Sequence, residues 1–176
     1  MKNYTLLIIG TFFVLTIALI GCAAKEVKSD LNVNKITYSF SYGDRIGGEI
    51  YVISSDFSMQ RYIIKANEDT DFDIETGELP SEGEYWLEEY TIPQENWKLL
   101  KTAVEENKFM ELPENVSNSA EVFDAGFCYI EVETNDATHR VGGFDAGGGK
   151  DKANKKFYGL KEEIINAIAS ASEKEE

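Results

Sequence analysis

The side chain with the clearest chemical prospect in this sequence is the thiol of Cys22, because of what precedes it. The chain carries no charged residue from Tyr4 to Gly21, and the short head before that run has a single lysine, Lys2. A cationic end, an apolar run and then small residues form the layout of a secretory signal. A thiol there could form a thioether to lipid, and each buried methylene would add about 0.8 kcal/mol of membrane affinity.

The residues Leu19, Ile20, Gly21 and Cys22 resemble the lipobox of bacterial lipoproteins, the type II signal peptide. In that family a diacylglyceryl group is attached to the cysteine, and the peptide is cut just before it. The resemblance implies that residues 1–21 are a lipoprotein signal peptide and that Cys22 is the site of lipid attachment, labelled by palmitate. It covers only the first two dozen residues. By length alone the run could instead be a permanent transmembrane helix, since it is long enough to cross a hydrocarbon core of roughly 30 Å.

The charge of the chain excludes some partners. The formal net charge is −15, and a chain that begins at Cys22 has sixteen Lys and Arg against thirty-two Asp and Glu, a charge of −16. Nucleic acid is excluded, because binding it requires basic residues that displace counterions. An anionic bilayer would also repel the folded domain. We therefore expect contact with the membrane only through lipid on Cys22, on the extracytoplasmic side of the cell membrane, or of an outer membrane if the host has two.

The remaining nucleophile and the only imidazole do not suggest catalysis. Cys128 lies in an apolar run, where a free cysteine behaves as a small hydrophobic residue, and His139 has no evident partner nearby in sequence. Neither a Gly-x-Ser-x-Gly nucleophile signature nor a zinc-ligand spacing occurs. We predict no catalytic residue and no cofactor.

Two loops look at first like ligand sites. Asp69, Asp71 and Asp73 alternate as at the start of a calcium loop, but the position that requires glycine is Ile74 and the position that requires glutamate is Pro80. No metal is therefore predicted, and 67–83 is interpreted as a solvated acidic loop. The glycine-rich stretch 142–150 lacks the spacing of a phosphate loop, and Asp151 follows it. It is expected to be a surface connection able to contact a ligand.

The elements that must carry these residues follow from periodicity. Period-two alternation predicts a strand at 36–42, and further strands are predicted at 49–54, 59–65, 85–90, 127–133 and 137–141. One helix is expected to start near Thr91 as the capping residue, and a last helix spans 151–169. Their apolar stripes are Trp97, Leu100 and Val104 in the first helix, and Phe157, Leu160, Ile164 and Ile168 in the second.

Strands joined mostly by hairpins and interrupted by single helices favour an α+β fold. We predict one domain with a mainly antiparallel sheet and two helices packed on one face. The expected division of the chain is a signal peptide at 1–21, the lipidated cysteine and a flexible tether at 22–34, the α+β ectodomain at 35–170 and an acidic tail at 171–176.

This layout predicts a lipid-anchored cell-envelope protein that binds rather than catalyses. A protein or other component of the envelope would contact loops 67–83 and 142–150 and exposed tyrosines. The alternative is an inhibitor or immunity-type protein that acts on an envelope or secreted partner through its acidic surface. An envelope hydrolase using paired carboxylates is the less favoured third hypothesis.

Overall fold

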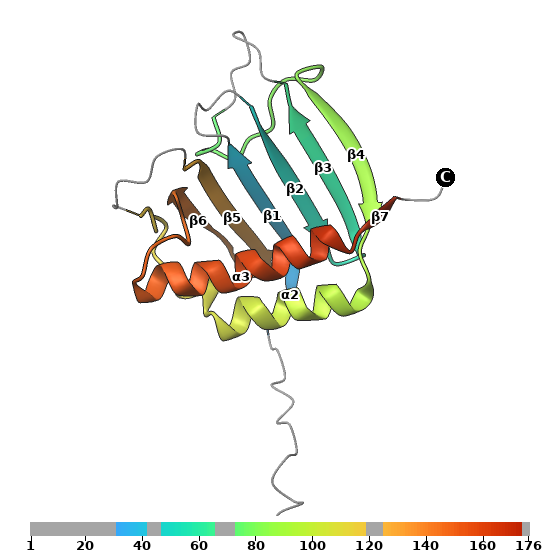
Figure 1. Cartoon of the computed structure of the whole chain (residues 1–176). Coiled ribbons are helices and arrows are strands. Elements are labelled where there is room, and N and C mark those ends of the chain that lie inside the picture. The colour runs from blue at the N-terminus through green and yellow to red at the C-terminus, as the bar shows by residue number, and fades with distance from the viewer. Residues whose placement is uncertain (1–30, 42–46, 66–72, 119–124, 174–176) are drawn as a thin grey trace, which may run out of the picture.

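The computed structural model describes residues 31–41, 47–65, 73–118 and 125–173. Leu19, Ile20, Gly21 and Cys22 lie outside these residues, as do Asp69 and Asp71. The elements run from Val33 to Glu173 (Figure 1). The strands are β1 Val33–Ser41, β2 Gly48–Ser54, β3 Ser58–Ile64, β4 Tyr85–Thr91, β5 Phe127–Thr134, β6 Thr138–Phe144 and β7 Ser172–Glu173; the helices are α2 Gln94–Glu106, the short 3-10 helix η1 Phe109–Glu111, and α3 Lys152–Ala169.

All the described strands belong to one antiparallel sheet in the order β6-β5-β1-β2-β3-β4-β7. Strands β1 to β4 follow one another as a meander, whereas β5 and β6 dock on the other side of β1. Strand β1 is therefore central although it comes first in the described chain. The predicted α+β fold, with an antiparallel sheet and two helices on one face, is confirmed.

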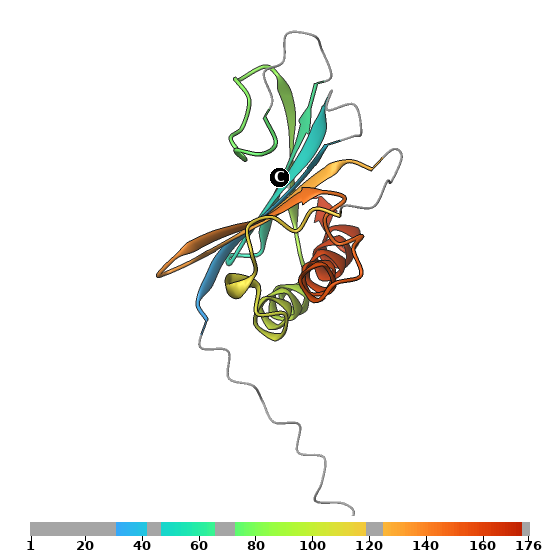
Figure 2. The ribbon, with the colours of Figure 1, turned by 90° about the vertical axis from the view of Figure 1, so that its left-hand side faces the viewer.

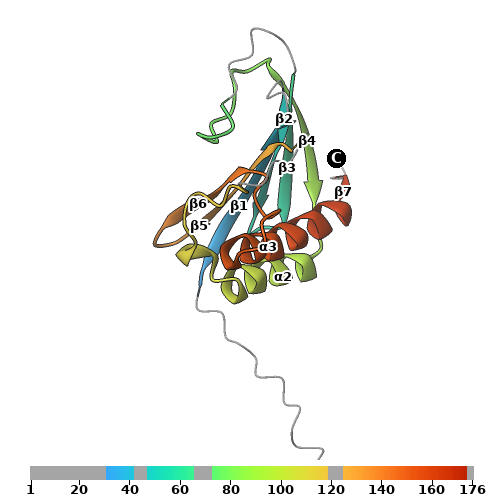
Figure 3. The same cartoon turned by 60° about the vertical axis from the view of Figure 1, so that its left-hand side comes forward.

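The two long helices run side by side in opposite directions across one face of the sheet (Figures 1 and 3). Both predicted stripes face the sheet, and Leu100, Phe157, Leu160 and Ile164 have no exposed surface. Each such side chain stabilises the fold by about 1.5–3 kcal/mol relative to leaving it exposed. Among the described helices, none is long and apolar enough to cross a membrane.

The helix starts differ in how closely they match the prediction. The last helix, predicted to span 151–169, begins at Lys152, and Asp151 caps it by accepting hydrogen bonds from the backbone N–H groups of Ala153 and Asn154. The predicted cap of α2 at Thr91 was wrong. Thr91 is the last residue of β4 and pairs with Ser58, and Pro93 occupies the cap position without a side-chain hydrogen bond. Thr91 therefore pairs within the sheet and does not cap the helix.

Glycine positions reflect close packing. Gly159, which costs stability within a helix, lies where a Cβ would come 2.7 Å from Oδ1 of Asn107, at the end of α2. Its lack of a side chain lets α2 and α3 approach closely. The prediction that Gly142 and Gly143 lie in a surface connection was wrong, since both are buried residues of β6. The connection itself begins after Phe144.

The described part of the acidic loop covers the sheet face opposite the helices (Figure 2). Its carboxylates Asp73, Glu75 and Glu78 are exposed, as predicted, but Ile74 and Pro80 are buried. Arg140 holds this segment, because its Nη2 donates a hydrogen bond to the Ile74 carbonyl at 2.7 Å. A small apolar cluster of Ile50, Tyr62 and Ile64, with Val52 and Tyr85 packed against it, lies apart from the main core.

Candidate functional site

Two cross-strand rows of side chains carry the most distinctive chemistry of the helix-bearing face. The strands present alternate residues on each face, so the register decides which side chains become neighbours. In order from β1 to β4, the first row is Tyr38, Tyr51, Arg61 and Glu88, and the second row is Phe40, Glu49, Ile63 and Trp86. Aromatic side chains therefore meet an arginine and two carboxylates on one surface.

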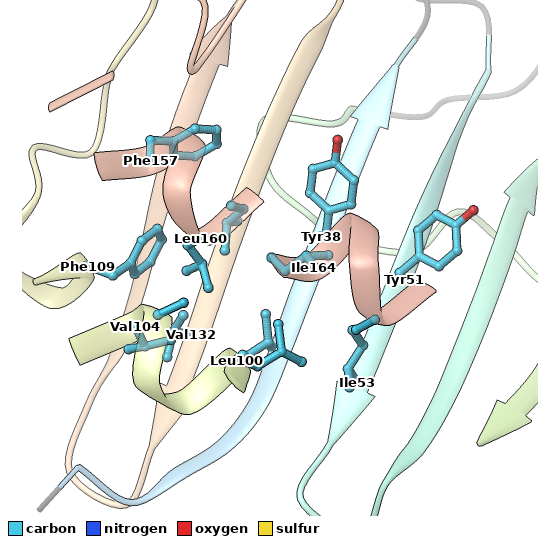
Figure 4. Close-up of a cluster of buried hydrophobic side chains, with 14 of the residues drawn as sticks. Tyr38, Tyr51, Ile53, Leu100, Val104, Phe109, Val132, Phe157, Leu160 and Ile164 are labelled. Atoms are coloured by element: carbon cyan, nitrogen blue, oxygen red, sulfur yellow. The ribbon is translucent and has the colours of Figure 1, made fainter. Parts of the chain in front are cut away.

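The aromatic end of these rows forms a groove against α3. The groove has a volume of about 300 Å³ and is lined by Tyr38, Phe40, Tyr51, Ile165 and Ile168. The ring centroids of Tyr38 and Phe40 are 5.7 Å apart, and those of Phe40 and Tyr51 are 6.5 Å apart. Figure 4 shows the rings of Tyr38 and Tyr51 beside α3, with Ile164 next to them. The groove can therefore accept an apolar group from outside the chain.

A hydrogen-bonded ion network borders the groove. Arg61 donates from Nε to Oε2 of Glu49 at 2.7 Å and from Nη1 to Oε2 of Glu88 at 3.1 Å. Each carboxylate also accepts from a tyrosine on its own strand, Glu49 from Tyr51 at 2.6 Å and Glu88 from Tyr90 at 2.7 Å. One guanidinium thus links three strands and fixes two tyrosine rings.

The electrostatics keep these donors protonated. Burial, followed by the hydrogen bond to Glu49, raises the pKa of Tyr51 above its ordinary value. Burial likewise raises the pKa of Tyr38. The hydrogen bond to Glu49 raises the pKa of Arg61. The network therefore holds a guanidinium and protonated phenols in fixed positions beside Glu49 and Glu88.

A second, more polar hollow of about 190 Å³ lies on the other side of Tyr38 and Phe40. It contains Cys128, which is a free, buried cysteine as predicted. The Cys128 sulfur lies 3.7 Å from Nζ of Lys161 and 3.5 Å from the Ala146 carbonyl oxygen. Burial raises the pKa of the thiol despite the lysine. The thiol is therefore held in its unreactive form.

His139 adjoins a polar hollow of about 470 Å³ that also includes Glu75, Glu114 and Arg140. Its Nε2 lies 2.8 Å from the Leu112 carbonyl oxygen, which can only accept a hydrogen bond. The imidazole must therefore donate its proton there, as expected for a structural strand histidine. Arg140 donates to the Ile74 carbonyl, so both of these side chains are held by backbone carbonyl groups.

The described residues contain no group of three or more His, Cys, Asp or Glu side chains that could hold a metal ion. The predicted lipid-attachment residue Cys22 lies outside the part of the chain that the structure describes. No protein-family model and no curated protein matches the sequence. Function must therefore be inferred from the chemistry of the sheet itself.

Sequence reasoning missed the Arg61 network, because its members lie on three strands whose register was unknown. A signal was nevertheless present. Glu49 and Tyr51 are two residues apart, as are Glu88 and Tyr90, so each pair lies on one face of its strand. Two strands with the same Glu-x-Tyr spacing, and an arginine on the strand between them, indicate a shared network.

Proposed function

We propose that this chain is a lipid-anchored module of the cell envelope that binds a partner protein through the groove beside α3. The observation that carries the proposal is the lining of the groove by three aromatic rings and two isoleucines. Ile165 is 47 % exposed on its rim. Such a hollow, bordered by fixed polar groups, is the usual form of a binding hot spot for an apolar or aromatic side chain.

The direction of β1 supports this proposal. The chain enters the sheet at Val33, beneath α2, whereas Tyr38 and Phe40 lie toward the other end of the strand (Figure 1). At about 3.3 Å per residue the groove lies about 20 Å from that entry point. An anchor at Cys22 would therefore join the domain at the end of β1 that lies farther from the groove.

The acidity of the chain favours a second candidate of the same kind. With a net charge of −15, the surface would steer a basic partner toward it. An inhibitor or immunity-type protein is a binding module whose partner is an enzyme or toxin. A hydrolase is less favoured, because Glu49 and Glu88 both bind Arg61 and neither is presented to the 300 Å³ groove as a lining residue.

The groove is tested by crosslinking in intact cells. A photoreactive amino acid at position 165 is expected to capture a neighbouring protein, and the same residue at position 99 is not. Leu99 is a matched control, because it is also 47 % exposed but lies on α2 away from the groove. The captured protein should then bind L99D normally and I165D at least about tenfold more weakly. Equal binding to both variants would exclude the groove.

The anchor is tested separately. Cys22→Ser should leave the precursor uncut and unlabelled by radioactive palmitate, while the wild-type chain is cut and labelled. Labelling of the variant at wild-type level would refute lipid attachment at Cys22. This result is independent of whether the groove binds a partner.

A further inference from the structure

The two edges of the sheet differ in how the chain covers them. Along β6, the Val116 N–H donates to the Gly142 carbonyl and the Gly142 N–H donates to the Glu114 carbonyl, both at 2.9 Å. On the side of β4 that faces away from β3, the only described neighbour is β7, which pairs with Tyr90 and Thr91 alone. In the described chain the outer side of β4 therefore has no strand beside it before Tyr90.

The phase of the β3–β4 ladder identifies the backbone groups on that outer side. Lys65 N–H donates to the Glu84 carbonyl at 2.9 Å. Because hydrogen-bonded residues alternate along an antiparallel pair, Trp86 also directs its backbone groups toward β3. The N–H and C=O groups of Tyr85 and Leu87 therefore point outward, in the direction from which β7 approaches further along the strand.

The side chains at this edge are unusual for a surface that stays in water. Trp86 is 58 % exposed and Leu87 is 46 % exposed, and as adjacent strand residues they lie on opposite faces of the sheet. The ammonium of Lys65 lies 5.0 Å from the centroid of the Trp86 ring. Sheet edges are commonly protected by proline, a bulge or charged side chains. Strand Tyr85–Thr91 has no proline and pairs with β3 in unbroken register, and its charged residues, Glu88 and Glu89, lie beyond Tyr85–Leu87.

The charge of the β3–β4 hairpin limits what can dock there. Residues 58–65 and 82–91 carry four glutamates against one arginine and one lysine. A second copy of the chain would place like charges against each other, at a cost of binding energy. A segment with basic residues would complement them.

We propose that an extended segment of a partner protein, carrying lysine or arginine between apolar residues, adds to β4 as a further strand at Tyr85–Leu87. Backbone hydrogen bonds to Tyr85 and Leu87 would supply affinity, and Trp86 and Leu87 would contact alternate side chains of the segment on the two faces. This proposed binding surface lies on β4 and shares no lining residue with the groove beside α3, so each proposal can be tested independently of the other.

The test uses the full-length chain and a synthetic peptide of alternating lysine and valine. In the free protein the amides of Tyr85 and Leu87 should exchange with solvent quickly, while that of Trp86 is protected by β3. Peptide addition should protect the first two amides and shift the fluorescence of Trp86 to shorter wavelength. A peptide of alternating glutamate and valine should bind more weakly, and added salt should weaken the basic peptide.

The matched variants are L87P and L87T. Proline removes only an outward-facing N–H at this position, so the β3 ladder survives, but peptide affinity should fall by about tenfold or more. L87T keeps the N–H and should bind nearly as the wild type does. A peptide methylated on alternate backbone amides cannot form the hydrogen bonds of an added strand. Comparing its affinity with that of the unmethylated peptide tests strand addition on the wild-type protein.

Four results would overturn the proposal: slow exchange at Tyr85 and Leu87 in the free chain, absence of peptide binding, equal affinity of L87P and L87T, or equal binding of the methylated and unmethylated peptides. A dimer that forms through β4 and is lost in L87P would show that a second copy, not a basic partner segment, occupies the edge. I165D should bind the peptide normally, so failure at the groove and failure at the edge are distinguishable.

Discussion

Arg61 on β3 binds Glu49 on β2 through Nε at 2.7 Å, and only 10 % of the Glu49 side chain is exposed. This pair lies directly beside Tyr51, whose ring centroid is 5.7 Å from the guanidinium carbon. The ion pair therefore sets the position of one wall of the groove.

The first prediction concerns this ion pair. R61A should destabilise the fold by about 3 kcal/mol, because it leaves the largely buried Glu49 without its guanidinium. K98A should change stability by less than about 0.5 kcal/mol, since the Lys98–Glu95 pair is exposed. Urea unfolding monitored by fluorescence measures both. If R61A proves as mild as K98A, the network does not stabilise the sheet.

The second prediction concerns the segment over the opposite face. Arg140 binds the Ile74 carbonyl, and its guanidinium carbon lies 4.9 Å from the centroid of the Tyr129 ring. R140A should cost about 2 kcal/mol through lost packing and hydrogen bonding. It should also open residues 73–84 to cleavage by a glutamate-specific protease under native conditions.

K35A is the control for R140A. The Lys35–Glu133 pair lies on the same face, but both side chains are more than a third exposed. Its loss should leave stability and protease resistance nearly unchanged. Rapid cleavage in K35A as well, or resistance in R140A, would contradict the role assigned to Arg140.

The third prediction concerns the thiol of Cys128. In the C22S chain Cys128 is the only thiol, and it is 6 % exposed. Because burial raises its pKa, a disulfide reagent should react with it slowly at pH 8 in the folded protein and rapidly in denaturant. K161M should slow the native reaction further, since Lys161 lowers the pKa of this thiol. Fast reaction in the folded chain would show that the hollow exposes the sulfur.

The fourth prediction concerns acid. The backbone N–H of Asn154 lowers the pKa of Asp151 below its ordinary value of 3.8. A lowered folded-state pKa means that the carboxylate stabilises the fold above pH 3.8 and that this contribution is lost as the pH falls through the folded-state value. D151A should therefore lower Tm at pH 7, and the difference from the wild type should narrow below pH 3.8. A difference that does not change with pH would assign the effect to helix geometry alone.

Local pattern was enough to predict most elements. The alternation from Ile36 to Phe40 and the stripes through Leu100 and Leu160 depend on near neighbours, so the strand and both helices are where the sequence places them. Contacts between residues far apart in sequence could not be predicted. Nothing local says that β1 lies between β2 and β5, and without that register neither the groove nor the Arg61 network can be assembled.

Thr91 and Gly142 illustrate the same limit. Thr91 has the side chain of a helix cap, but the neighbouring strand β3 pairs with it first. Gly142 belongs to a glycine-rich stretch typical of loops, yet a Cβ there would meet the ring of Tyr129 on β5. In both cases a tertiary contact overrides the local preference.

The central place of β1 has a consequence for the order of folding. Val33 and Phe40 pair with Thr134 and Cys128, close to the far end of the chain, and Ile164 on the last helix completes the core. Contacts of such long sequence separation form slowly, because the intervening chain must first be brought together. The polypeptide therefore cannot close its hydrophobic interior until the last helix has been synthesised, so folding must follow rather than accompany most of its synthesis.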